Sequence, residues 1–298
     1  ELVRAAELAW YTPFVEPTSD LKKLLGPTLE KYKLSVTHLN AFIDLSRGGP
    51  QHFLLDHLLH FPSAKSPSAS YGTAIHNTLQ QAHIHLVATG ERKPIEDVLH
   101  DFENNLAQMR LSPLDHATYQ QKGSEQLQIF LKQNYDYFTS SQKAELDFGR
   151  QEVVLGEAHL TGKIDVADID PLEKTMIVTD YKTGKPSLGW KGSDEWEKIK
   201  LYKYRQQLMF YQLLIGHSRD YHTYSVLSGR LCFVEPTRAG DISTLELSFE
   251  KDELERFSIL IQKIWQKIMT LDLPDISAYE PTLRGIMRFE DDLLNDAL

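Results

Sequence analysis

The chain has 298 residues, 41% of them hydrophobic and 25% charged, which is enough apolar material for one large domain or two small ones. It has no run of about 18 apolar residues, no signal-peptide pattern and a single cysteine, Cys232. These features exclude a membrane-spanning helix and an internal disulfide, and they predict a cytoplasmic protein. The net charge of −10 argues against binding of nucleic acid by bulk electrostatic attraction.

The first 145 residues are predicted to be mostly helical. Residues 1–33 contain several prolines and no sustained periodicity, which indicates a linker or a segment that wraps a neighbour. The region 34–145 is predicted to contain helices that begin near Thr37, run from about 71 to 88 with a stop at Gly90, follow Pro94, and run from about 113 to 138.

The helix predicted at 71–88 has an apolar stripe, and His76 lies beside it. The stripe consists of Ile75, Leu79, Ala82 and Leu86. A histidine in such a place is more often a hydrogen-bonded residue at the edge of the core than a metal ligand. Periodicity alone therefore assigns no functional role to His76.

The region 146–272 is predicted to form a sheet, with strands near 150–156, 160–169, 174–181, 222–228, 230–234 and 243–249. A helix at about 200–215 interrupts these strands, and another at about 251–271 closes the core. Cys232 lies in the apolar run LCFV and is most simply a buried thiol. Residues 273–298 are rich in Asp and Glu and are interpreted as an acidic C-terminal tail.

The stretch LTGKIDVADIDPLEKTMIVTDYKTGK, residues 160–185, contains two strand-like runs around a turn at about 171–174. If the runs pair as a hairpin, residues whose numbers sum to 345 lie opposite each other, which places Asp165 across from Asp180. Opposed β-carbons are about 5 Å apart, and two carboxylates at that spacing repel unless a cation such as Mg²⁺ or Mn²⁺ lies between them. Lys182 shares a strand face with Asp180. The hairpin therefore predicts two carboxylates and an ammonium around one ion.

A surface hairpin with exposed charges is the alternative, and a slip of one residue would turn Asp165 to the opposite face. The apolar run from Met176 to Val178 favours a buried strand. Gly162 and Gly184 flank the charged residues and are typical of positions where a bulky substrate approaches the backbone.

Basic and aromatic residues follow the hairpin closely. The basic ones are Lys185, Lys191, Lys198, Lys200, Lys203 and Arg205, and the aromatic ones are Trp190, Trp196, Tyr202 and Tyr204. Together they form a candidate channel for a nucleic-acid strand, in which aromatic rings stack on unpaired bases. For any single residue, a helix with a solvated basic face and core aromatics is the better interpretation.

Three further polar residues are candidates for the site. Gln207 and Tyr211 are four residues apart and share a helix face, although helix packing through Tyr211 explains the pair equally well. Glu152, on the strand expected before the hairpin, could reach the ion or an attacking water. Glutamate on an edge strand is common, so this assignment has less support.

Four short motifs occur in a fixed order: GTAIH ending in His76, GKID ending in Asp165, DYK with Asp180 and Lys182, and QLMFY from Gln207 to Tyr211. The ordered set resembles the PD-(D/E)XK nuclease superfamily and, within it, the RecB-like branch. Residues 34–55, LSVTHLNAFIDLSRGGPQHFLL, are similar to the lead-in helix of that branch, so the resemblance covers about 34–270. It implies an α/β fold with a restriction-endonuclease-like core, a central mixed β-sheet flanked by helices, and an N-terminal helical region.

The resemblance implies a metal-dependent nuclease that hydrolyses phosphodiester bonds in DNA. The expected ligands of Mg²⁺ or Mn²⁺ are His76, Asp165, Asp180 and the carbonyl of Tyr181. Lys182 is expected to orient the attacking water and to offset charge in the transition state, with Glu152 as a further catalytic candidate. The expected supporting or DNA-binding residues are Gln207, Tyr211, Lys185, Lys200, Lys203 and Arg205.

One feature departs from many RecB-like nucleases, which bind an iron–sulfur cluster through a Cys-Pro in the lead-in and three cysteines near the C-terminus. This chain has Gly49-Pro50 in the lead-in and only Cys232, so we expect no such cluster. The pattern is similar to the RecB and AddA type, in which the nuclease follows a helicase motor in one polypeptide. Glu1 in place of an initiating Met suits a piece of a longer chain.

We therefore expect an exonuclease that acts on single strands or DNA ends in recombination or repair, together with a helicase. A catalytically inactive nuclease-like module that guides DNA or braces a helicase is the main alternative. A freestanding nuclease of phage or CRISPR type is a third. The intact set of two aspartates, lysine and histidine favours an enzyme.

Overall fold

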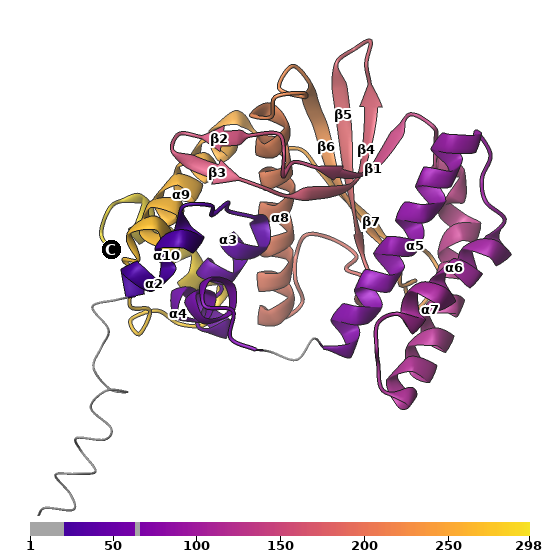
Figure 1. Ribbon diagram of the computed structural model, residues 1–298, viewed down its shortest axis with the longest axis horizontal. Helices are drawn as coiled ribbons and strands as arrows, with labels where there is room; N and C mark the ends of the chain where they lie inside the picture. Colours follow the sequence, from indigo (N-terminus) through magenta and orange to yellow (C-terminus); the bar gives the residue numbers. More distant parts are fainter. Residues whose placement is uncertain (1–20, 63–65) are drawn as a thin grey trace, which may run out of the picture.

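A five-stranded mixed sheet forms the centre of the computed structural model, which describes residues 21–62 and 66–298 (Figure 1). The strand order is β1 (Gln142–Asp147), β4 (Lys163–Asp170), β5 (Thr175–Lys182), β6 (Ser225–Phe233) and β7 (Thr244–Leu247). Only β5 and β6 are parallel; the other neighbours are antiparallel. Parallel strands need a long crossover, and here α8 (Glu195–Gly216) supplies it.

The β4–β5 hairpin has the register that the sequence predicts. The pairs run from Val166 opposite Thr179 to Asp170 opposite Thr175, and the residue numbers of each pair sum to 345. The same register, extended by one residue, sets Asp165 beside Asp180 at the end of the ladder. The hairpin lies inside the sheet rather than on the surface, since β4 and β5 each have a neighbour on both sides.

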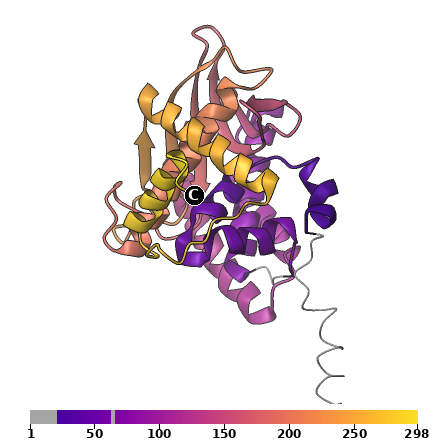
Figure 2. The same cartoon turned by 90° about the vertical axis from the view of Figure 1, so that its left-hand side faces the viewer.

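Helices cover both faces of the sheet (Figures 1 and 2). One layer consists of α5 (Pro67–Thr89), α6 (Ile95–Ala107) and α7 (Pro113–Asn134), which pack on Val166, Tyr181 and Cys232. The other layer consists of α8, α3 (Val36–Ile43), α9 (Lys251–Thr270) and α10 (Leu283–Leu294), which share a core with Ile164 and Val178. Cys232 is buried, as the sequence predicts.

Local signals start and stop the helices that matter for the site. The hydroxyl of Ser66 accepts a hydrogen bond from Ala69 N at the start of α5, and Pro67 follows at the first helical position. Gly90 ends the helix with φ of 77°, a left-handed conformation that glycine adopts without steric cost. Asp194 caps α8 by accepting from Glu197 N.

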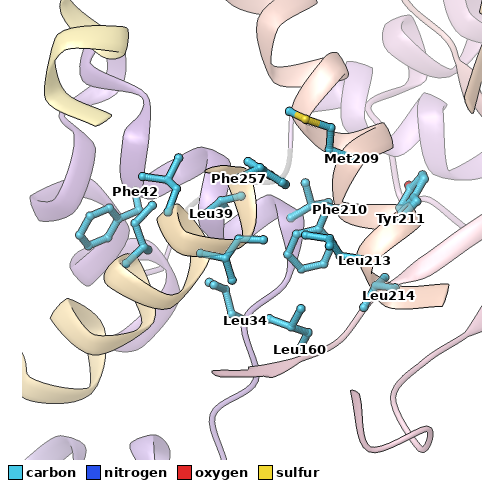
Figure 3. Close-up of a cluster of buried hydrophobic side chains, with 14 of the residues drawn as sticks. Leu34, Leu39, Phe42, Leu160, Met209, Phe210, Tyr211, Leu213, Leu214 and Phe257 are labelled. Carbon is cyan, nitrogen blue, oxygen red and sulfur yellow. The ribbon is translucent and has the colours of Figure 1, made fainter. Parts of the chain in front are cut away.

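The core beneath α8 is shown in Figure 3, where Leu34 and Leu39, Leu160, Phe210 and Phe257 lie together. These side chains come from the N-terminal region, from β3 (Ala158–Leu160), from α8 and from α9. Phe210 is fully buried and Tyr211 is 3% exposed. Because interiors are closely packed, this core holds α8 in one position relative to the sheet.

Several elements differ from the sequence prediction. Residues 142–147 form β1, although the chain up to about 145 was expected to be helical. One strand, β6, replaces the two expected at 222–228 and 230–234. The acidic tail contains α10, an amphipathic helix that buries Ile286, Phe289 and Leu293 together with the acidic residue Glu290.

The N-terminal region consists of short elements. They are α2 (Leu21–Leu29), α3, a 3₁₀ turn (Leu45–Arg47), α4 (Gly49–Phe53) and a π-helical turn (Leu54–Leu58). Gly48, with φ of 99°, separates the 3₁₀ turn from α4, so the expected lead-in helix is broken. The predicted linker 1–33 falls partly outside the described residues, and its described part contains α2.

Two minor elements complete the description. The strands β2 (Val153–Leu155) and β3 form a separate two-stranded hairpin, which a bridge between Leu34 and Leu160 joins to the N-terminal region. A 3₁₀ turn (Tyr135–Tyr137) follows α7. Across residues 21–62 and 66–298, the helices are all too short or too polar to cross a membrane.

Candidate active site

Asp180 is the most enclosed side chain of the candidate site. It lies on β5, is 3% exposed, and points toward α8. Its Oδ1 accepts hydrogen bonds from Gln207 Nε2 at 2.7 Å and from the Tyr211 hydroxyl at 2.8 Å. Lys182 Nζ lies 2.7 Å from the buried Oδ2, which has no other polar partner among the described residues. The predicted pair Gln207 and Tyr211 therefore faces the site.

Lys182 lies between the strand and α8. Its Nζ donates to Gln207 Oε1 at 2.6 Å and lies 4.2 Å from the centroid of the Tyr204 ring. A cation over a ring face is stabilised by the ring quadrupole, so Tyr204 supports the position of the ammonium. The sequence suggested Tyr204 as a surface for stacking bases, and this contact with Lys182 is a role that we did not predict.

Asp165 and His76 meet at the other side of the site. Asp165 Oδ2 accepts a hydrogen bond from Tyr181 N at 2.8 Å, and His76 Nδ1 lies 3.2 Å from Asp165 Oδ1. Asp165 is opposite Asp180 in the hairpin register, whereas His76 comes from α5, some 90 residues earlier in the chain. The structure thus brings together the histidine, both aspartates and the lysine.

Close packing of α5 on the end of β5 explains how His76 reaches the sheet. A β-carbon added to Gly72, in the same GTAIH motif, would lie 3.1 Å from Thr183 Oγ1. The glycine therefore permits a tighter approach than a side chain would. Gly162 has a similar role toward α8, because a β-carbon added there would lie 2.8 Å from Leu214 Cδ1. A β-carbon added to Gly184 would meet no atom within 4 Å.

Burial and charge shift the acid–base behaviour of the site. Burial raises the pKa of the Asp180 carboxyl; the Lys182 ammonium opposes this rise and the Asp165 carboxylate adds to it. Burial by itself lowers the pKa of His76, but the contact with Asp165 outweighs it, and the net shift is upward. Burial also raises the pKa of Tyr211, which keeps its hydroxyl a donor to Asp180.

The donor types suit a hard divalent cation, because two carboxylates and an imidazole converge at the end of the β4–β5 hairpin. The arrangement is not a ready coordination sphere. Within residues 21–62 and 66–298, no three His, Cys, Asp or Glu side chains are spaced to hold a metal ion. The oxygens instead face Lys182, Gln207, Tyr211 and the backbone, so an ion would compete with these contacts.

Glu152 does not belong to this cluster. It is exposed, has φ of 52°, and lies in the turn before β2 rather than on a strand of the central sheet. The strand that precedes the hairpin in the sheet is β1, and its residue opposite Asp165 is Glu145, which the sequence analysis missed. Glu145 has φ of 50° and lies 3.6 Å from Lys163 Nζ. The alternating pattern of QKAELD was the signal for this strand.

The predicted basic channel separates into two groups. Lys203 Nζ lies 2.6 Å from the buried carboxylate of Asp44, and Arg205 pairs with Glu253, so both hold helices together. Lys185 is exposed, and Lys200 Nζ donates to its carbonyl at 3.4 Å. Of the four predicted DNA-binding cations, only Lys185 and Lys200 form no salt bridge with a carboxylate of the described residues.

His83 is a second buried histidine that the sequence analysis did not select. Its Nε2 lies 3.0 Å from the Tyr181 hydroxyl and its ring stacks on Phe138, at 3.8 Å between centroids. Burial lowers its pKa to about 4. His83 therefore anchors the Tyr181 side chain in the core on the far side of the sheet and does not face Asp180.

The comparisons with known proteins agree with this geometry. The family model described as the PD-(D/E)XK nuclease superfamily matches residues 33–280. A solved structure described as "Putative exonuclease" from Eubacterium rectale aligns with a TM-score of 0.53 and 12% identity, over 87% of this chain and 89% of that one. None of the curated proteins matches the sequence. At 12% identity the structural likeness speaks for the fold, which is restriction-endonuclease-like, and the family match covers most of the chain. This chain belongs to the PD-(D/E)XK nuclease superfamily.

Proposed function

We propose that the protein is a metal-dependent DNA nuclease that hydrolyses phosphodiester bonds, acting as an exonuclease on single strands or DNA ends. The observation that carries the proposal is the convergence of Asp165, Asp180, Lys182 and His76 at one end of the β4–β5 hairpin. Convergence of several partly buried ionisable groups at one place is costly and is typical of functional sites. The family membership supports the same reaction class.

In this proposal the carboxylates of Asp165 and Asp180, the imidazole of His76 and the carbonyl of Tyr181 hold one or two Mg²⁺ or Mn²⁺ ions. The chemistry supplied by a bound ion is polarisation of the scissile phosphate and a lowered pKa of a coordinated water. Gln207 and Tyr211 orient Asp180 through the two hydrogen bonds to its Oδ1. Rigid donors of this kind keep a carboxylate in place during turnover.

Lys182 is the residue proposed to act on the reacting phosphate. Its side chain is 13% exposed, and its ammonium is held by Gln207 and Tyr204 beside Asp180. A fixed positive charge in a site that excludes water offsets negative charge that develops on the phosphate oxygens. The same ammonium donates a hydrogen bond that can orient an attacking water. Its contribution is therefore expected in the chemical step rather than in binding.

A catalytically inactive module is the second candidate, and one feature favours it. The oxygens of Asp180 already contact Lys182, Gln207 and Tyr211, so the cluster is stable without any ion. Such a module would bind DNA or brace a helicase without cleaving a phosphodiester. The intact set of His76, Asp165, Asp180 and Lys182 argues for the enzyme, because a module that no longer cleaves DNA would be free to lose these residues.

We also propose that the domain works with a helicase in recombination or DNA repair, as in the RecB and AddA type. The support is the absence of cysteines other than Cys232, which leaves no ligand set for an iron–sulfur cluster. Reading the complete open reading frame tests the helicase part. Helicase motifs upstream of residue 1 would support it, and a gene that encodes only this domain would contradict it.

The activity is tested by incubation of the purified chain with end-labelled single-stranded and duplex DNA in Mg²⁺, Mn²⁺ or EDTA. We expect degradation in either metal and none in EDTA. An Asp165→Ala preparation, purified identically, controls for contaminating nucleases. Oligonucleotides with blocked ends separate exonucleolytic from endonucleolytic cleavage. Binding of DNA without any cleavage would favour the inactive module.

A further inference from the structure

One face of α8 connects the candidate active site to the surface. Residues 196, 200, 204, 207 and 211 follow each other at intervals of three or four, so their side chains lie along one side of the helix. Tyr211 and Gln207 contact Asp180, and Tyr204 lies beneath Lys182. Trp196 and Lys200 continue the same line toward the N-terminus of α8. At 1.5 Å per residue, the line from Gln207 to Trp196 is about 16 Å long.

The far end of this line carries an exposed aromatic ring beside a cation. Trp196 is 67% exposed, and Lys200 Nζ lies 5.2 Å from its ring centroid. Lys185, which follows β5 by three residues, offers its carbonyl to Lys200 and is itself exposed. An exposed tryptophan loses favourable apolar burial, so an exposed ring beside the Lys200 ammonium, with Lys185 in contact with Lys200, is suited to a flat, anionic partner.

The other aromatic and basic residues of this region do not offer such a surface. The indole of Trp190 donates to Glu246 O, and Tyr202 donates to Glu290, so both are tied to the protein. Among the acidic side chains of the first turn, Asp194 caps the helix and Glu197 accepts from Ser187 and Ser193. These bonds hold the loop 183–194 against α8 and fix the position of Trp196 and Lys200.

From these contacts we propose that the N-terminal half of α8 holds a single-stranded segment of the substrate, with an unpaired base stacked on Trp196 and phosphates held by Lys200 and Lys185. The proposal rests on the proposed function and specifies its substrate as an unpaired strand. A duplex keeps its base faces stacked inside the helix, so it has no free face for the Trp196 ring. The phosphate contacts alone would be available to both forms.

Binding of two labelled DNAs to the full chain tests the proposal. The probes are a fluorescein-labelled oligothymidine and a blunt duplex of equal length, and fluorescence anisotropy in EDTA measures affinity without hydrolysis. Trp196→Ala is expected to weaken oligothymidine binding about tenfold, which is within the range for one stacked base, and to change duplex binding less than about twofold. Trp196→Phe, which keeps a ring, is expected to retain most of the affinity.

Lysine variants separate stacking from charge. Lys200→Ala is expected to weaken the binding of both DNAs a few-fold. It should also reduce the slope of log affinity against log salt concentration by about one unit. Lys251→Ala is the control, because Lys251 is an exposed lysine at the start of α9, outside the candidate channel, and it pairs with Glu255 at 3.4 Å. It should bind both DNAs like the parent. Circular dichroism and thermal unfolding confirm that each variant is folded.

The outcomes distinguish this proposal from the proposed function. If the parent degrades DNA but Trp196→Ala binds oligothymidine as tightly as the parent, the proposed strand contact on α8 is wrong and the nuclease assignment stands. If the variants bind as predicted but the parent cleaves no DNA in Mg²⁺ or Mn²⁺, the nuclease assignment is wrong and the proposed strand contact on α8 stands. Equal weakening of single strand and duplex by Trp196→Ala, or a parent that binds neither DNA, also overturns the proposal.

Discussion

Two buried carboxylates lie on opposite sides of α8, and each is held by a glutamine and a tyrosine of that helix. Asp180 accepts from Gln207 and Tyr211, whereas Glu290 of α10 accepts from Gln206 at 2.8 Å and from Tyr202 at 2.5 Å. Each carboxylate is 3% exposed. A Gln–Tyr pair around a buried acid is therefore not a signature of catalysis in this protein.

The surroundings of the two acids differ. Asp180 has an ammonium at 2.7 Å and a second carboxylate, Asp165, on the neighbouring strand, where His76 of α5 contacts it. Among the described residues, Glu290 contacts only neutral donors, and it joins α10 to α8. Its pKa is raised to about 7, first by burial, with the hydrogen bonds from Tyr202 and Gln206 opposing the rise. What separates a site from a structural contact is the convergence of charges, not the pair of hydrogen-bond donors.

The largest expected effect is on hydrolysis. Asp180→Asn should reduce the rate of single-turnover DNA cleavage on the order of 10³-fold or more. When catalytic residues act as a unit, removal of one costs about as much activity as removal of all of them. Glu290→Gln should cleave within about twofold of the parent. Quenched-flow assays at saturating DNA measure both rates. Comparable losses in the two variants would mean that the comparison between the acids is wrong.

Lys182→Ala should slow single-turnover cleavage on the order of 10²-fold, as deletion of a group that stabilises transition-state charge does. DNA affinity should change little, since one phosphate contact carries a small part of the binding. Filter binding in EDTA and cleavage in Mg²⁺ separate the two quantities. Lys251→Ala is the control, since that exposed lysine pairs with Glu255 within α9, away from the site. Cleavage by Lys182→Ala at the parental rate would remove Lys182 from the mechanism.

Stability should depend on pH through Glu290. Its pKa in the folded state, about 7, lies above the ordinary glutamate value of 4.5, so the folded state binds more protons between these pH values. The contribution is fully present below about pH 4.5 and is lost as pH rises through 7. Between pH 5 and 8 the parent should therefore lose about 2 kcal/mol relative to Glu290→Gln. Urea unfolding of both proteins at the two pH values measures this difference, and parallel pH profiles would contradict it.

The smallest effect is expected at Gly72. An added β-carbon would meet Thr183 Oγ1 at 3.1 Å, so Gly72→Ala should shift α5 slightly and move His76 from Asp165. We expect a few-fold loss of cleavage and a change in unfolding free energy within about 1 kcal/mol, because alanine favours the helix and offsets the contact. Gly216→Ala is the control, since a β-carbon added there would meet no atom within 4 Å. An unaffected Gly72→Ala would show that His76 tolerates displacement.

The side-chain pattern of the sequence anticipated much of the site. The period of two along a strand places Asp180 and Lys182 on one face, and the turn at about 171–174 sets the register that opposes Asp165 to Asp180. The four-residue spacing of Gln207 and Tyr211 put them on one helix face. These relations are local, because they depend only on the geometry of single elements and of one hairpin.

The sequence could not assign the partners of residues that lie far apart in the chain. Lys203 and Arg205 were expected at DNA, but Asp44 and Glu253 neutralise them, over separations of 159 and 48 residues. Glu152 was placed on the wrong strand because β1 was not recognised, and α10 was taken for a tail. Gln206 and Gln207 are neighbours of identical chemistry, and only the packing of α8 between the sheet and α10 decides that Gln207 faces Asp180. Local periodicity thus determined which residues share a face, whereas the tertiary structure decided what each face meets, because long-range packing energies select among faces that are locally equivalent.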